Sequence, residues 1–220
     1  MLKSEKKNIK PMQHQGSTHE QKMASMTQLK ILTWNIQQGL AADSPLKFYR
    51  YAAQYLIRSK KTQNLDRIAE ALQAEDADIV ALQEADSMCL RSGADQAEYI
   101  AKKAGYDHAA TGMNTGFRNI YRMGNATLSK HPFVRTENHA LPEGMEQRGA
   151  LETSICIHDS LIFIFNTHLN LEKSAAASNL NYLFNKMHAG LDALQIPYII
   201  SFSTSVFHWW FLVSFTSCGK

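Results

Sequence analysis

The sequence predicts a single α/β domain, because segments with the pattern of strands alternate with segments with the pattern of helices. Residues 29–35 (LKILTWN) are rich in apolar and β-branched side chains, and residues 78–84 (DIVALQE) are apolar on both faces, as in a strand covered on both sides. Between them, apolar side chains recur at helical spacing: Leu65, Ile68, Ala69 and Leu72. The 220 residues, 45% hydrophobic and 20% charged, suffice for one sizeable core.

The remaining elements continue the mixed pattern along the chain. A helix over residues 94–104 stops at Gly105, a residue that suits the left-handed conformation at a helix C-terminus. Apolar side chains at helical spacing predict a long helix over residues 175–195. Strands are expected over residues 120–128, in a hairpin of 152–157 with 161–167, and over 196–200.

The N-terminal segment and the charge limit the possible partners. Residues 1–28 are polar, lack apolar periodicity and hold no secretory signal, so they are expected to form a disordered leader. Six lysines and two glutamates in residues 1–30 contribute +4, and since the net charge is +3, residues 31–220 sum to −1. A near-neutral body gives no electrostatic reason to expect long nucleic acid. The three cysteines form no C-x-x-C pair, which argues against a disulfide scaffold or zinc knuckle and favours a cytoplasmic location.

Five polar residues at or near strand ends are candidates for a functional site: Asn35, Glu84, Asn125, Arg148 and His168. Taken singly, an asparagine or glutamate after a strand is more often a turn or helix cap than a ligand. Taken together, these side chains can form a site for a phosphate group and a hard cation. Glu84 can give Mg²⁺ an oxygen, Arg148 can bind two phosphoryl oxygens, and His168 can transfer a proton.

The motifs around these residues occur in a characteristic order between residues 29 and 200: Thr-Trp-Asn-Ile (33–36), Asp-Ile-Val-Ala-Leu-Gln-Glu (78–84), Gly-Asn-Ala-Thr-Leu-Ser (124–129), Arg-Gly-Ala-Leu (148–151) and Asn-Thr-His-Leu (166–169). In order and spacing they resemble the endonuclease/exonuclease/phosphatase superfamily of metal-dependent phosphoesterases. The resemblance implies a four-layer α/β sandwich, in which two face-to-face β-sheets are covered by outer helices.

The resemblance also implies roles for the five candidates. Glu84 and Asn35 belong to a metal site for Mg²⁺ or Mn²⁺, while Asn125, Arg148 and His168 are catalytic residues that face the scissile phosphate. The substrate is a phosphate ester: nucleic acid, a phospholipid head group and small phosphodiesters are all open. No obligate protein partner is inferred.

The chain departs from the family pattern after residue 200. The family carries Gly-Asp-x-Asn after a strand such as 196–200 and Asp-His after a later strand, whereas this sequence continues with Ser201-Phe202-Ser203-Thr204 and has no Asp or Glu after Asp192. Six of the 21 aromatic residues lie in the last 20 positions. We therefore expect a partial domain over residues 29–200, a sandwich incomplete at the C-terminus, and an aberrant hydrophobic tail over 201–220, the result of truncation or a frameshift. Hydrolysis by this chain is expected to be impaired.

Two alternatives belong to other functional classes. The absence of the late acidic motifs favours a non-catalytic remnant that binds phosphate ligands without turnover. A tail-anchored membrane protein is the less favoured alternative: residues 196–215 have about the length needed to cross a bilayer, but serine, threonine and His208 interrupt them.

Overall fold

The computed structural model describes residues 29–39, 58–87, 95–117, 121–142, 146–157, 160–190, 198–203 and 209–214. The predicted leader, residues 1–28, lies outside the described residues. In chain order the elements are β1 (Ile31–Asn35), η1 (Gln37–Gly39), α3 (Arg58–Glu75), β2 (Ile79–Asp86), α4 (Gln96–Ala104), β3 (His108–Phe117), β4 (Tyr121–Ser129), β5 (Phe133–Ala140), β6 (Gly149–Ile157), β7 (Ser160–His168), α5 (Lys173–Gly190), β8 (Tyr198–Ser203) and β9 (Trp209–Ser214).

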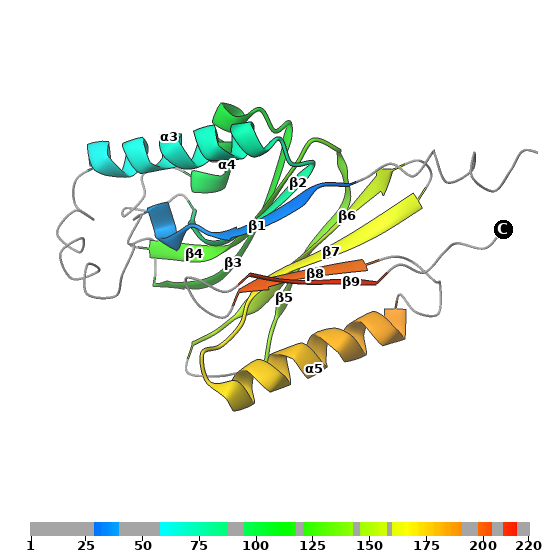
Figure 1. The fold of residues 1–220 in the computed structure, drawn as a ribbon. Coiled ribbons are helices and arrows are strands. Elements are labelled where there is room, and N and C mark those ends of the chain that lie inside the picture. The colour runs from blue at the N-terminus through cyan, green and yellow to red at the C-terminus, as the bar shows by residue number, and fades with distance from the viewer. Residues whose placement is uncertain are drawn as a thin grey trace, which may run out of the picture.

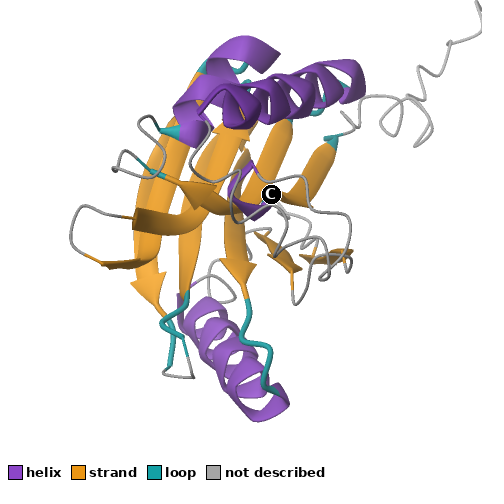
Figure 2. Cartoon of the chain, turned by 90° about the vertical axis from the view of Figure 1, so that its left-hand side faces the viewer, coloured by secondary structure: helices purple, strands orange, loops and turns teal. Residues whose placement is uncertain are grey.

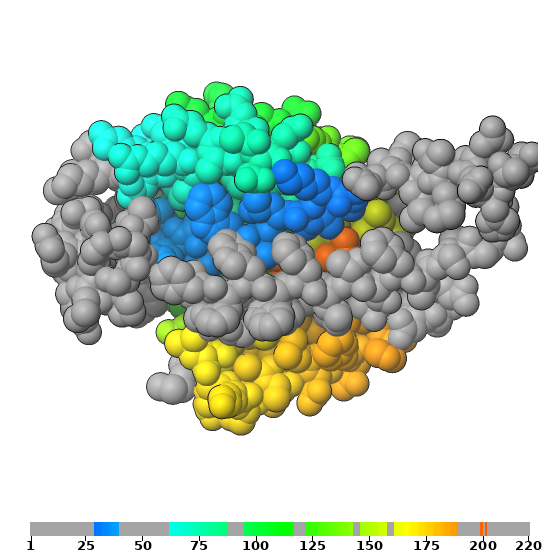
Figure 3. Space-filling model, in the orientation of Figure 1, coloured from blue at the N-terminus to red at the C-terminus, as the bar shows by residue number. Residues whose placement is uncertain are grey.

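Two sheets face each other and helices cover their outer sides, so the predicted four-layer sandwich is confirmed (Figure 1). The first sheet has the strand order β1-β2-β4-β3, and the second has the order β5-β6-β7-β8-β9. The sheets contact each other through β2 with β7 and through β4 with β6. Figure 2 shows the helices above and below the two layers of strands. In the space-filling view, β1 lies between α3 and α5 (Figure 3).

The helices form where the sequence places apolar side chains on one face. The α3 residues Leu65 and Leu72 pack with Ile100 of α4 against Val80 and Leu82 of the first sheet. On the second sheet, Leu183 and Met187 of α5 pack against Phe163 and Phe165. Each helix therefore buries its apolar stripe against one outer sheet face.

Helix α4 ends as predicted. Asp95 caps its N-terminus, and the side chain of Asp95 accepts a hydrogen bond from the Glu98 backbone N–H at 3.1 Å. Gly105 has φ 85°, and its N–H donates to the Ala101 carbonyl at 3.0 Å. A side chain at this position would be strained in the left-handed conformation, so glycine terminates the helix.

The layer between the sheets contains a buried polar network as well as apolar contacts. Asn166 on β7 donates to the carbonyl oxygens of Leu82 (3.0 Å) and Ala126 (2.8 Å) on the opposite sheet. Its own Oδ1 accepts from Gln83 Nε2 at 2.8 Å, and Gln83 Nε2 also donates to Thr33 Oγ1 at 2.9 Å. These side chains are fully or almost fully buried, so the network ties the two sheets together.

The C-terminal strands differ from the prediction in extent. Strand β8 reaches Ser203, three residues beyond the predicted domain end at residue 200, and β9 pairs with it in antiparallel orientation. Residues 198–203 and 209–214 thus form two strands, and residues 204–208 lie outside the described residues. Within the described part of the chain, no helix has the length and apolar character needed to cross a membrane.

Candidate active site

Glu84 lies at a distortion of strand β2. The register between β2 and β4 shifts between Leu82 and Ala85, and Glu84 has a positive φ of 55°. Positive φ is uncommon for a residue with a side chain, and bulges of this kind turn a side chain away from the regular alternation of a strand. Glu84 therefore does not end its strand, as the sequence predicted, but interrupts it two residues before Asp86, the last residue of β2.

The Glu84 carboxylate is held by three polar side chains. Its Oε1 accepts a hydrogen bond from Asn35 Nδ2 at 3.0 Å and lies 3.5 Å from His168 Nε2. Its Oε2 accepts from Gln38 Nε2 at 3.5 Å. Asn35 is fixed in turn, because its Oδ1 accepts from the Gln37 backbone N–H at 3.0 Å. Asn35 and His168 end β1 and β7, as predicted, and both strand ends meet at Glu84.

One pocket brings four of the predicted residues together. Its lining residues are Glu84, Asn114, Thr115, Met123, Gly124, Asn125, Gln147, Arg148 and His168. Glu84 is the one acidic residue in this lining, within the part of the chain that the structure describes. The free volume of about 10 Å³ is close to the minimum that holds one water molecule. The fifth candidate, Asn35, reaches the pocket through its bond to Glu84.

The far wall of the pocket is built around the start of β6. Asn125 lies in the middle of β4, and its Nδ2 donates to the Gly149 carbonyl at 2.9 Å, which also accepts from Thr167 Oγ1 at 3.0 Å. Arg148 directly precedes β6 and forms an ion pair with Glu146 at 2.8 Å. The buried Arg148 Nε and His168 Nδ1 have no hydrogen-bond partner among the described residues. The pocket thus presents unused polar atoms beside one carboxylate.

Burial shifts the protonation of both titratable groups at the centre of the site. Desolvation raises the pKa of Glu84, although its hydrogen bond from Asn35 and the charge of Arg148 act in the opposite direction. Desolvation and then the positive charge of Arg148 lower the pKa of His168 to about 3. His168 is therefore neutral near pH 7.

We expect the neutral state of His168 to make stability depend on pH. The pKa of His168 in the folded state lies below its unfolded value of about 6.5. The contribution of the neutral side chain to the free energy of unfolding is therefore fully present above pH 6.5 and is lost as the pH falls toward 3. Urea unfolding in metal-free buffer should show that His168→Gln loses less stability than the wild type between pH 7 and pH 4. His188→Gln, a change at an exposed position of α5, should keep the wild-type dependence. Identical pH profiles for the wild type and His168→Gln would contradict the expectation.

The site fits a divalent cation at Glu84. Its carboxylate side chain is only 19% exposed and forms no ion pair with a lysine or arginine of the described residues. A buried carboxylate without a cationic partner is unfavourable, and Mg²⁺ or Mn²⁺, which prefer oxygen ligands, would remove that penalty. Asn35 turns its amide nitrogen toward Glu84, so in this arrangement it orients the carboxylate.

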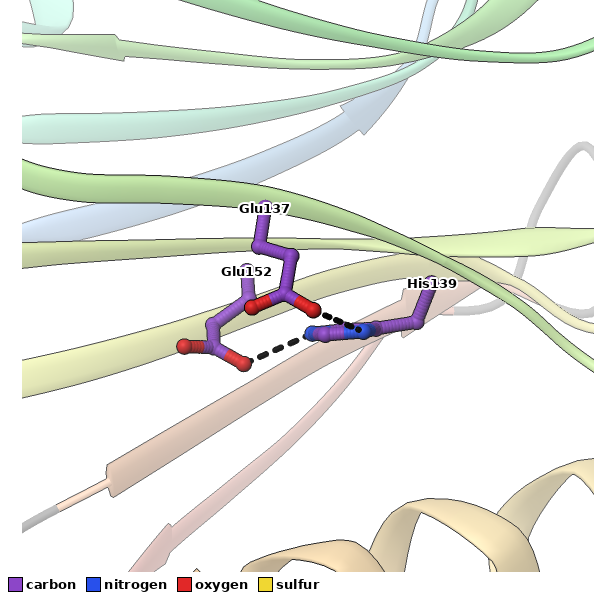
Figure 4. A group of neighbouring side chains, drawn as sticks. All are labelled: Glu137, His139 and Glu152. Carbon is purple, nitrogen blue, oxygen red and sulfur yellow. Dashed lines mark hydrogen bonds and ion pairs between the residues drawn. The ribbon is translucent and has the colours of Figure 1, made fainter.

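A second group of potential metal ligands lies away from the pocket. Glu137, His139 and Glu152 each offer an atom within 4.8 Å of the others. The two ring nitrogens of His139 contact different carboxylates, Glu152 at 2.7 Å and Glu137 at 3.3 Å (Figure 4). Arg135 also pairs with both glutamates. Arg135 and His139 therefore already contact both carboxylates, which lie directly opposite each other in the β5–β6 register.

This second group belongs to the other face of its sheet. The His139 ring lies 6.4 Å from the ring of Phe165, which packs in the α5 core. At 5% exposure, His139 packs inside the fold. We assign the group to the pairing of β5 with β6.

Sequence reasoning missed several residues that line the pocket or contact Glu84. Asn114 and Thr115 come from β3, which was not predicted as a strand, so nothing in the sequence placed them near Glu84. Gln147 directly precedes Arg148, and Gln38 follows the Thr-Trp-Asn-Ile motif. For Gln147 and Gln38, closeness in sequence to a motif was the one signal that could have indicated a place in the site.

Comparison with solved structures reveals the same fold at low sequence identity. An endonuclease/exonuclease/phosphatase from Beutenbergia cavernae is 23% identical with a TM-score of 0.57, and the match covers 79% of this chain and 46% of that one. A mannosyl-6-phosphatase from Bacteroides thetaiotaomicron is 16% identical with a TM-score of 0.57, and the match covers 80% of this chain and 64% of that one. ANGEL2, a 2′,3′-cyclic phosphatase, is 17% identical with a TM-score of 0.57, and the match covers 79% of this chain and 52% of that one. The chain thus spans less than two thirds of each.

The family assignment comes from the sequence itself. A search of curated proteins found no significant match. A family model described as the Endonuclease/Exonuclease/phosphatase family matches residues 32–196, which is well over half of the chain, and this range contains all five candidate residues. The chain therefore belongs to the endonuclease/exonuclease/phosphatase family.

Proposed function

We propose that this protein hydrolyses a phosphate ester with the help of Mg²⁺ or Mn²⁺. The observation that carries the proposal is the convergence of Glu84, Asn125, Arg148 and His168 on one pocket, with Asn35 bound to Glu84. The solved structures of similar fold include two named as phosphatases, one for a mannosyl 6-phosphate group and one for a 2′,3′-cyclic phosphate. The shared chemistry of these names is cleavage of a phosphate ester.

Each residue has a role that its surroundings support. Glu84 holds the cation, and Asn35 keeps the carboxylate in place. A cation bound there supplies positive charge that neutralises phosphoryl oxygens. Arg148 binds a phosphoryl oxygen through its guanidinium, whose buried Nε has no hydrogen-bond partner among the described residues.

Asn125 and the neutral His168 act as hydrogen-bond donors toward the phosphate. One Asn125 amide hydrogen binds the Gly149 carbonyl, which fixes the direction of the other. A neutral imidazole donates from one ring nitrogen and accepts at the other. Because donors that are already oriented need no reorganisation during the reaction, this arrangement favours the charge that develops on the phosphoryl oxygens.

A phosphate-ligand binder without turnover is the second candidate. It is favoured by the single carboxylate in the pocket lining of the described residues, since Glu84 cannot both hold a cation and activate water. The hydrolysis that we propose is accordingly slow for this chain.

Hydrolysis of bis(p-nitrophenyl) phosphate in the presence of Mg²⁺ or Mn²⁺ tests the proposal. We expect slow, metal-dependent release of p-nitrophenolate that falls at least about 100-fold in Glu84→Ala and in His168→Ala, because each removes a group that acts on the reacting phosphate. Glu98→Ala, an exposed change on α4, is the matched control. Ester binding without metal-dependent release would favour the binder, and release that survives Glu84→Ala would contradict the site.

A further inference from the structure

A larger cavity that is widely open to solvent adjoins the pocket on the side of β3 and β4. It has a volume of about 220 Å³ and is lined by Met113, Asn114, Thr115, Gly116 and Arg122. Asn114 and Thr115 line both spaces, so the two are contiguous. The inner pocket has room for about one water or ion, so the outer cavity offers adjoining space for a larger part of a ligand.

The wall between the two spaces is Asn114, the extra residue of a β-bulge. Met113 pairs with Gly124 and Thr115 pairs with Met123, which leaves Asn114 without a partner in the β3–β4 register. Its side chain lies against Gly149, where an added Cβ would come within 1.9 Å of Asn114 Oδ1. Glycine at the start of β6 is therefore required for Asn114 to occupy this place.

Hydrogen bonds to neighbouring residues fix which atoms of this wall remain available. Asn114 Oδ1 accepts from Asn138 Nδ2 at 3.0 Å, and Thr115 Oγ1 donates to the Gln147 carbonyl at 2.8 Å. Neither the Asn114 amide nitrogen nor the Arg122 guanidinium has a hydrogen-bond partner within the described ranges, and no carboxylate of those ranges lines the cavity. The groups left free are thus donors, one of them cationic.

We propose that the outer cavity binds a second phosphate group of the substrate, in contact with Arg122 and the Asn114 amide. The inference rests on the proposed function, in which the scissile phosphate contacts the residues that line the inner pocket. A guanidinium beside an amide N–H matches the oxygens of a phosphate in both charge and hydrogen bonding. The preferred substrates are then esters that carry two phosphates, whether in a nucleotide or in a phosphorylated sugar.

Calorimetric titration in Mn²⁺ buffer can test the two spaces separately. The probes are inorganic phosphate, thymidine 3′,5′-bisphosphate and fructose 1,6-bisphosphate, and the variants are Arg122→Gln, Arg148→Gln and Arg67→Gln. Arg67 is exposed on α3, so its replacement removes the same charge away from the site. We expect Arg122→Gln to weaken bisphosphate binding about 10-fold and to leave phosphate binding unchanged, while Arg148→Gln weakens both.

The outcomes separate this inference from the proposed function. The second phosphate site would be overturned if bisphosphates bound no more tightly than phosphate, or if Arg122→Gln bound bisphosphates as tightly as Arg67→Gln. In either case, phosphate binding that depends on Arg148 would still support the inner pocket. Absence of any Arg148-dependent phosphate binding would overturn both. Tighter binding of thymidine 3′,5′-bisphosphate supports a nucleotide as the source of the second phosphate. Tighter binding of fructose 1,6-bisphosphate supports a phosphorylated sugar.

Discussion

Replacing Glu84 with glutamine should abolish specific binding of Mn²⁺, with an affinity loss of at least about 100-fold. Glu84 is the one acidic residue in the described lining of the pocket, and no neighbouring side chain of that lining can take over as a charged ligand. A hard cation held by one carboxylate keeps most of its waters and binds weakly, so loss of that carboxylate leaves only neutral ligands. Calorimetry and the water-proton relaxation of Mn²⁺ measure the effect.

The same substitution also separates metal binding from folding. Glutamine keeps the size of the side chain and can still accept the hydrogen bond from Asn35 Nδ2. Because burial raises the pKa of Glu84, the neutral side chain should leave the free energy of unfolding in metal-free buffer unchanged or increase it. Glu98→Gln on the exposed face of α4 should bind Mn²⁺ like the wild type. Equal Mn²⁺ affinity in Glu84→Gln would show that the cation binds elsewhere, for example at Glu137 and Glu152.

Most of the fold could be predicted because its helices and buried strands carry strong local patterns. Strand β2 is apolar on both faces since it lies between a helix layer and the second sheet. Strands β3 and β5 were missed for the opposite reason. β3 (HAATGMNTGF) is rich in glycine and polar residues, and β5 is an edge strand whose side chains are mostly not buried. Their pairing partners, and not their own sequences, determine them as strands.

The candidate site was predictable as a set of residues but not as a geometry. Asn35 and His168 follow strands in the sequence, and the structure brings both to Glu84. The bulge that turns Glu84 toward them depends on the pairing of β2 with β4, which no local pattern encodes. Asn114 could not be predicted as a site residue from the sequence, because its position requires Gly149, a residue of the opposite sheet.

Asn166→Leu should lower the free energy of unfolding by about 3 kcal/mol or more, because it leaves buried polar groups without their hydrogen-bond partner. Asn166 donates to the Leu82 and Ala126 carbonyls and accepts from Gln83, and all of these atoms lie between the sheets. Leucine has nearly the same size, so lost hydrogen bonding and not a cavity dominates the effect. Urea unfolding measures it, with Asn185→Leu on the exposed face of α5 as the matched control.

A double-mutant cycle with Gln83→Leu decides whether the network acts as a unit. Gln83→Leu alone leaves Asn166 Oδ1 and Thr33 Oγ1 without their donor, so it should also be destabilising. In the double variant neither side chain is left as an unpaired polar group, and replacing both partners by apolar groups costs less than removing one. The double variant should therefore lose clearly less stability than the sum of the two single variants. Strict additivity would mean that Gln83 and Asn166 stabilise the sheets independently. If Asn166→Leu lost no more stability than Asn185→Leu, the network would not hold the sheets together.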